Sequence, residues 1–132
     1  MSHCIAPIPE ATDRVAREII DAAYKVHQTL GPGLLESVYE TCLCHELTVR
    51  GVTWARQVPV NIVYGEIQIE AGLRIDVFVA ECVIVELKAV EYMKPLFEAQ
   101  LLTYLKLTGT RLGLLINFNS PLFKQGVKRM AL

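Results

Sequence analysis

Apolar residues recur at two different periods along the chain, and the period changes near residue 51. Before that point they fall three and four residues apart, a spacing that places side chains on one face of a helix. The pattern predicts a first helix capped by Thr12 or Asp13 and a second helix over residues 35–50. Gly31-Pro32-Gly33 separates the two, because glycine and proline in this order end a helix.

After residue 51 apolar and polar residues alternate, which is typical of half-buried strands. Four strands are expected before the next helix, in the segments 52–64, 67–69, 73–79 and 82–88. Pro95 suits the first turn of a third helix, which Gly109 ends. A buried strand over residues 112–118 and a short edge strand around residues 127–130 complete the chain.

The element order α-α-β-β-β-β-α-β predicts an α/β (α+β) fold, in which helices flank a central mixed sheet. A chain of 132 residues fits one domain. We therefore expect an irregular N-terminal arm over residues 1–10, where Pro7 and Pro9 stand without periodicity, and a single domain over residues 11–132.

Composition excludes several classes of protein. Hydrophobic residues make up 52% of the chain and charged residues 20%, which excludes a disordered chain. No apolar run reaches the roughly 18 residues that span a bilayer, and the first residues lack the pattern of a secretory signal. We therefore expect a cytoplasmic protein without a membrane partner. The four cysteines are expected as free thiols, because the Cys42-x-Cys44 spacing is too tight for a usual zinc site.

Charge is unevenly distributed, although the formal net charge is only −1. From Ala99 to Leu132 there are five basic residues and no acidic one, whereas the first 98 residues carry a net charge of −6. A basic segment of this kind can lie along the phosphates of a nucleic acid. A solvated basic edge gives the same pattern, and charge alone favours that second interpretation.

Two expected strands carry carboxylates among apolar neighbours. Asp76 stands between Ile75 and Val77, and Glu86 between Val85 and Leu87. A tight turn at Ala80-Glu81 pairs these strands, so the two carboxylates are expected to lie close together. Such a pair is costly near a core unless a cation is present, and oxygen ligands suit Mg²⁺ or Mn²⁺.

Lys88 shares a strand face with Glu86, and there it can orient an attacking water or stabilise charge on a phosphate. The alternative is structural: Glu86 and Lys88 form an exposed ion pair and Asp76 is solvated. The sequence leaves both interpretations open.

Further side chains are candidates for the same site. Glu36 and Tyr39 lie along one side of the second helix, where Glu36 is either a ligand or a helix-start residue favoured by the helix dipole. Gln100 and Tyr104 share a face of the third helix and can position a substrate. His27 is a possible accessory residue, although a histidine near a helix end is more often structural.

These residues resemble a known family. Gly33, Glu36 and Tyr39 match the signature of the GxxExxY proteins, which are placed in the PD-(D/E)XK nuclease superfamily. The resemblance extends from about residue 13 to the C-terminus. It is carried by Gln57-Val58-Pro59-Val60, Arg74-Ile75-Asp76, Glu86-Leu87-Lys88, and the Gln100 and Tyr104 of a Q-x-x-x-Y motif typical of the RecB-like branch.

The resemblance implies a restriction-endonuclease-like core and a metal-dependent nuclease, but it does not supply a substrate. Of the two nucleic acids, we expect DNA rather than RNA. By resemblance, Glu36, Asp76 and Glu86 hold Mg²⁺ or Mn²⁺, Lys88 completes the catalytic motif, and Gln100 and Tyr104 position the substrate. Ile75 replaces the proline of the motif, a change that the superfamily tolerates.

The alternative function is a non-catalytic nucleic-acid-binding or assembly module on the same fold. A third interpretation is an enzyme that acts on another phosphate or nucleotide substrate, because fold alone does not define function. A domain of this size has little extra surface for target recognition, so a homodimer or a protein partner is also considered.

Overall fold

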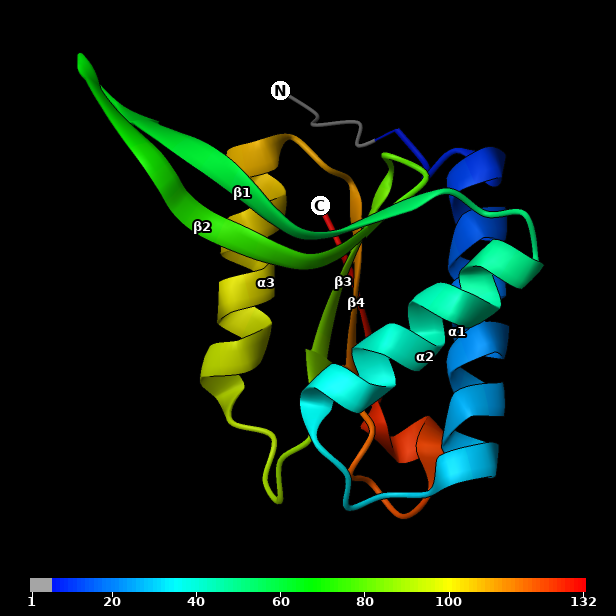
Figure 1. Cartoon of the computed structure of the whole chain (residues 1–132). Coiled ribbons are helices and arrows are strands. Elements are labelled where there is room, and N and C mark those ends of the chain that lie inside the picture. Colours follow the sequence, from blue (N-terminus) through cyan, green and yellow to red (C-terminus); the bar gives the residue numbers. More distant parts are fainter. Residues whose placement is uncertain (1–5) are drawn as a thin grey trace.

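A five-stranded mixed sheet forms the centre of the protein, and the computed structural model describes residues 6–132 (Figure 1). The helices are α1 (Glu10–Leu30), α2 (Glu36–Val49) and α3 (Pro95–Thr108), with a 3-10 helix η1 at Phe123–Gly126. The strands are β1 (Trp54–Tyr64), β2 (Ile67–Val79), β3 (Val83–Lys88), β4 (Leu112–Asn117) and β5 (Val127–Ala131). The predicted fold class, a mixed sheet flanked by helices, is confirmed.

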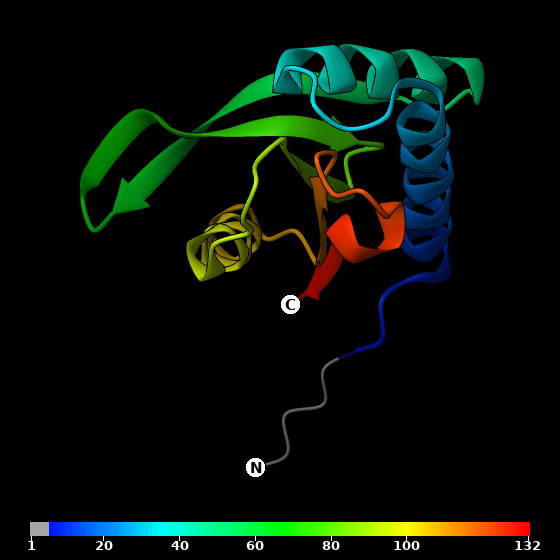
Figure 2. The ribbon, with the colours of Figure 1, turned by 90° about the horizontal axis from the view of Figure 1, so that it is seen from below.

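The sheet order is β1-β2-β3-β4-β5, and β3 and β4 are its parallel pair. A parallel pair needs a long crossover, which α3 supplies. Figure 2 shows α3 on one side of the sheet and α1 and α2 on the other. On the α3 side, Leu101 and Leu105 pack against Ile84 and Leu115. The core is therefore divided into two layers by the central strands.

Gly113 of β4 makes the close approach of α3 possible. A Cβ atom at this position would lie 2.8 Å from Cδ1 of Leu101, which is closer than side chains tolerate. Leu101 is fully buried against the strand. A small residue is therefore required where the helix crosses the sheet.

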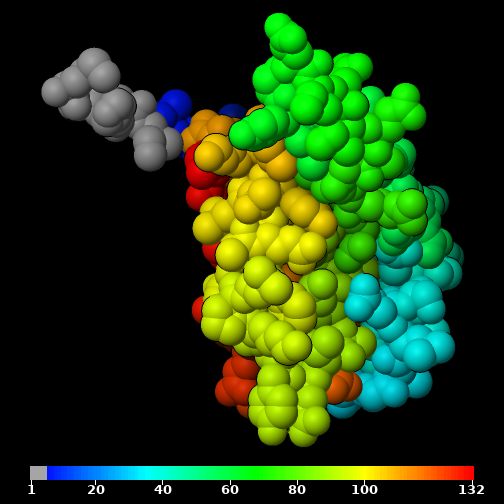
Figure 3. All heavy atoms as spheres, turned by 90° about the vertical axis from the view of Figure 1, so that its left-hand side faces the viewer, coloured from blue at the N-terminus to red at the C-terminus, as the bar shows by residue number. Residues whose placement is uncertain are grey.

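β1 and β2 form a long antiparallel hairpin that projects beyond the rest of the sheet (Figures 1 and 3). Its outer end is apolar and exposed at Val63, Tyr64 and Ile67. The break expected near Gly72 is absent, so three strands, rather than four, precede α3. Gly72 instead gives room to Ile62 of the paired strand, whose Cδ1 would lie 2.5 Å from a Cβ there.

The predicted start of the first helix is also wrong. α1 begins at Glu10 after Pro9, and the backbone N–H of Asp13 already donates to the Pro9 carbonyl at 3.0 Å. Asp13 pairs with Arg129 of β5, and Thr12 is buried. Residues 1–5 of the expected arm lie outside the described residues. Among the described helices, none combines the length and apolar character that crossing a membrane requires.

Candidate active site

Asp76 and Glu86 meet where β2 and β3 stop pairing through their backbones. The last paired residues are Val77 and Val85. Beyond them, the Asp76 N–H donates to Oε2 of Glu86 at 2.8 Å, and the Leu87 N–H donates to Oδ2 of Asp76 at 2.9 Å. Side-chain carboxylates thus take the place of backbone acceptors, and the expected proximity of these two residues is observed.

Burial makes this pair electrostatically unfavourable. Glu86 is only 5% exposed, and its pKa is raised to about 8, first by loss of solvation and then by the nearby Asp76 charge. Burial also raises the pKa of Asp76, an effect that the hydrogen bond from the Leu87 N–H opposes. Both carboxyl groups resist ionisation because they are close together and shielded from solvent. A bound cation would stabilise their ionised forms.

Lys88 stands two residues after Glu86, at the end of β3. Its charge lowers the pKa of both Asp76 and Glu86, opposing the effect of burial. The Lys88 ammonium lies 4.4 Å from the centroid of the Phe97 ring on α3. The structural alternative, an exposed Glu86–Lys88 pair beside a solvated Asp76, is wrong because Glu86 is buried and Asp76 is half-buried.

Glu36 is the first residue of α2 and faces the carboxylates of the sheet. Its pKa is raised by burial and then by the charge of Asp76, while Lys88 lowers it. The Glu36 side chain therefore belongs to the same electrostatic cluster as Asp76, Glu86 and Lys88, although residue 36 remains largely exposed.

Gln100 and Tyr104 approach the cluster from α3. Gln100 Nε2 donates to the Tyr104 hydroxyl at 2.9 Å. The pKa of Tyr104 is raised by burial and by the negative charge of Glu86. The Tyr104 hydroxyl is therefore close enough to the Glu86 carboxylate to interact with its charge. Helix α3 thus adds a polar pair to the site formed by α2, β2 and β3.

His27 and Tyr39 have partners elsewhere. His27 Nε2 donates to the Ser120 carbonyl at 2.8 Å, and its ring packs against Phe123. The Tyr39 hydroxyl donates to the Gly31 carbonyl at 2.6 Å, and its ring stacks on Phe118. Tyr39 thereby secures the loop that leads into Glu36, and the structure does not bring His27 or Tyr39 into the carboxylate cluster.

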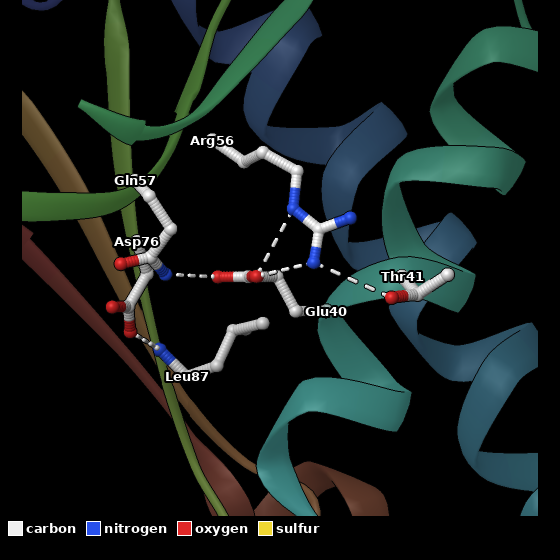
Figure 4. A network of polar contacts seen from close by, with 6 residues as sticks. All are labelled: Glu40, Thr41, Arg56, Gln57, Asp76 and Leu87. Atoms are coloured by element: carbon white, nitrogen blue, oxygen red, sulfur yellow. Dashed lines mark hydrogen bonds and ion pairs between the residues drawn. The ribbon is translucent and has the colours of Figure 1, made fainter.

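A second polar network borders the site, and sequence reasoning missed it (Figure 4). Glu40 is 6% exposed and pairs with Arg56 at 2.6 Å, and Gln57 Nε2 donates to Glu40 Oε1 at 2.7 Å. The charge of Glu40 raises the pKa of both Asp76 and Glu36, so it is close to them. The one sequence signal was its spacing, four residues after Glu36 on the same helix face.

The donor set fits a hard divalent cation. Glu36, Asp76 and Glu86 supply carboxylate oxygens, the ligands that Mg²⁺ and Mn²⁺ prefer, and their charges oppose one another. Within residues 6–132, no group of three His, Cys, Asp or Glu side chains is already arranged to hold a metal ion.

The fold and this cluster define a class of protein. It is a restriction-endonuclease-like domain whose Asp…Glu-x-Lys site lies where two paired strands, β2 and β3, separate. A family model described as the PD-(D/E)XK nuclease superfamily matches residues 13–130 of the chain. The chain belongs to this superfamily, which supports a nuclease-type function with a nucleic acid as substrate. Proteins of the superfamily generally use divalent metal ions. No curated protein and no solved structure matched the chain.

Proposed function

We propose that this protein is a metal-dependent nuclease that hydrolyses phosphodiester bonds of nucleic acid, with DNA rather than RNA as its substrate. The observation that carries the proposal is the pair of buried Glu86 and half-buried Asp76, in which each carboxylate accepts a backbone N–H, with the positive charge of Lys88 beside it. The placement among GxxExxY proteins of the RecB-like branch rests on the sequence resemblance.

Glu36, Asp76 and Glu86 would hold one or two Mg²⁺ or Mn²⁺ ions. A bound ion of this type lowers the pKa of water and so provides a hydroxide nucleophile at neutral pH. The protein's own contribution is to present three oxygen donors from two elements of the sheet and the first turn of α2. The two backbone hydrogen bonds leave the second oxygen of each sheet carboxylate free for an ion.

Lys88 would act on the phosphate. Its ammonium donates hydrogen bonds to the oxygen that gains negative charge, or orients the attacking water, and its place over Phe97 restricts its motion. The Tyr104 hydroxyl and the Gln100 amide would donate hydrogen bonds to the phosphate backbone of the substrate. These bonds would hold the scissile phosphodiester bond next to the carboxylates. Homodimer formation or a protein partner would extend the short binding surface along the substrate.

The alternative is a module that binds nucleic acid without cleaving it. The two functions differ in their need for metal: a binding module retains its affinity for nucleic acid in EDTA, whereas a nuclease of this class stops cutting.

The decisive experiment measures cleavage of linear duplex DNA, circular duplex DNA, single-stranded DNA and RNA in Mg²⁺, Mn²⁺ or EDTA. Lys88→Ala is compared with Lys25→Ala, which removes an exposed lysine of α1 that pairs with Glu46. We expect cleavage that requires metal, falls about 100-fold or more in Lys88→Ala, and is unchanged in Lys25→Ala. Equal cleavage by Lys88→Ala contradicts the proposal, as does cleavage in EDTA.

A further inference from the structure

Gln57 has an unusual backbone conformation next to the carboxylate site. Arg56 pairs with Val77 and Val58 with Ile75, so Gln57 stands opposite Asp76 in the hairpin. Its φ is +52°, in the left-handed region that residues other than glycine rarely adopt. Such a conformation persists only when surrounding contacts hold it, and it is a reason to ask what the side chain does.

The contacts that hold Gln57 come from an ion pair between buried Glu40 and exposed Arg56. Oε2 of Glu40 accepts hydrogen bonds from Nε and an Nη of Arg56, at 3.1 and 2.6 Å. Arg56 also donates to the Thr41 hydroxyl at 3.3 Å. With Glu40 Oε2 occupied in this way, Oε1 accepts from the Gln57 amide at 2.7 Å. Helix α2 therefore determines where the Gln57 side chain lies.

The Gln57 amide lies between two carboxylates, those of Glu40 and Asp76 (Figure 4). An amide nitrogen carries two hydrogens, and one is donated to Glu40. Figure 4 shows the Gln57 amide next to the Asp76 side chain, on the strand that pairs with β2. Gln57 and the Leu87 N–H therefore lie on different sides of the Asp76 carboxylate (Figure 4).

We propose that Gln57 is a positioning residue, which the Glu40–Arg56 pair holds in place so that it orients the Asp76 carboxylate for a divalent ion. This inference rests on the proposed function, because it assumes that Asp76 is a metal ligand. Partners that orient a ligand in this way commonly change metal affinity by 10- to 100-fold when they are removed. It also gives a purpose to the Gln57-Val58-Pro59-Val60 segment, which the proposed mechanism does not use.

The left-handed conformation allows a sharp test. Gln57→Gly removes the amide but suits the backbone, because glycine adopts positive φ without strain. Ala71→Gly is the matched control: Ala71 has a φ of +50° in the same hairpin and is exposed. Gln57→Asn is a second variant, since asparagine tolerates this conformation but its amide is one methylene shorter. Mn²⁺ affinity is measured by isothermal titration calorimetry and thermal stability by circular dichroism.

We expect both Gln57 variants to bind Mn²⁺ about 10-fold more weakly than the wild type, with Tm close to that of the wild type. Ala71→Gly should bind Mn²⁺ normally. Cleavage by Gln57→Gly should recover as the Mn²⁺ concentration rises, while its KM for DNA stays unchanged, which a merely structural role does not explain.

Two outcomes overturn the inference, and only the second of them also overturns the proposed function. If the wild type and both Gln57 variants bind Mn²⁺ equally well, Gln57 does not position a metal ligand, and the proposed function stands. If the wild type binds no Mn²⁺, the proposed metal-dependent function fails and this inference fails with it.

Discussion

The ammonium of Lys88 lies 4.4 Å from the centroid of the Phe97 ring, so the last residue of β3 is joined to the first turn of α3. An aromatic face attracts a cation and limits the orientations of a long, flexible side chain. The contact directs the one lysine of the Glu-x-Lys motif toward the carboxylates whose pKa values it lowers. The position of Lys88 thus depends on a helix that is distant from Asp76 in sequence.

Replacement of Phe97 should therefore reduce activity without unfolding the protein. Phe97→Leu keeps an apolar side chain but removes the ring, and we expect cleavage to fall about 3- to 30-fold, the equivalent of ~0.5–2 kcal/mol. Phe97→Tyr retains the aromatic face and should cleave at close to the wild-type rate. The measurement is kcat on a fluorescent oligonucleotide in Mg²⁺. A Phe97→Leu variant as active as Phe97→Tyr shows that the ring does not position Lys88.

Glu86→Gln should stabilise the metal-free protein while abolishing cleavage. The pKa of Glu86 is about 8 in the folded protein and near 4.5 in the unfolded chain. The folded state keeps a proton that the unfolded chain releases above pH 4.5, so the free energy of unfolding falls as pH rises from 4.5 to 8. Glutamine carries no charge, and it removes this loss.

Thermal melts in EDTA test this prediction. At pH 8 we expect Glu86→Gln to be more stable than the wild type by about 1–3 kcal/mol, and at pH 4 the difference should vanish. Glu66→Gln, at the exposed turn of the hairpin, is the matched control and should change neither value. A Glu86→Gln variant that is less stable at pH 8 contradicts the assignment of the raised pKa to burial.

Cys44 should be the least reactive of the three described thiols, which also include Cys42 and Cys82. Burial raises the pKa of Cys44 to about 11 from 9.0, and the Glu40 charge adds to this effect against that of Arg56. At pH 8 the folded protein then holds about 100-fold less Cys44 thiolate than an ordinary cysteine does. Alkylation by iodoacetamide, followed by peptide mass spectrometry, should label Cys44 last in native protein.

The control for this experiment is the unfolded protein, in which all three thiols should react at similar rates. The same shift predicts lower stability at high pH. Above pH 9 the unfolded chain ionises Cys44 while the folded protein keeps it protonated, so the free energy of unfolding decreases between pH 9 and 11. Rapid labelling of Cys44 in the native state would show that α2 opens frequently.

Gly113→Ala should destabilise the contact between β4 and α3. The added methyl group would lie 2.8 Å from Cδ1 of Leu101, and overpacking of this kind costs about 1–3 kcal/mol. Chemical denaturation measures the change in the free energy of unfolding. Leu101→Ala destabilises by itself because it leaves a cavity, but in its presence Gly113→Ala should cost less. Simple additivity of the two substitutions is the result that contradicts this explanation.

Local patterns allowed several features to be predicted. The change from helical to alternating periodicity located the helices and most strands, and the short Ala80-Glu81 turn between two apolar runs placed Asp76 opposite Glu86. Where local patterns were ambiguous, the predictions were wrong: Gly72 does not end a strand, because Ile62 packs over it across the hairpin. A glycine in a strand gives no local indication of whether it breaks the strand or accommodates a neighbour.

The sequence by itself determined the order of elements, the alternation that buries one face of each strand, and the Asp76, Glu86 and Lys88 motif, since all depend on spacing along the chain. Only the tertiary structure decided which other side chains reach the site. Gln57 faces Asp76 because α2 packs against the hairpin and because Glu40 pairs with Arg56 across 16 positions. Contacts between separate elements depend on how those elements pack, and the periodicity of each element does not contain that information.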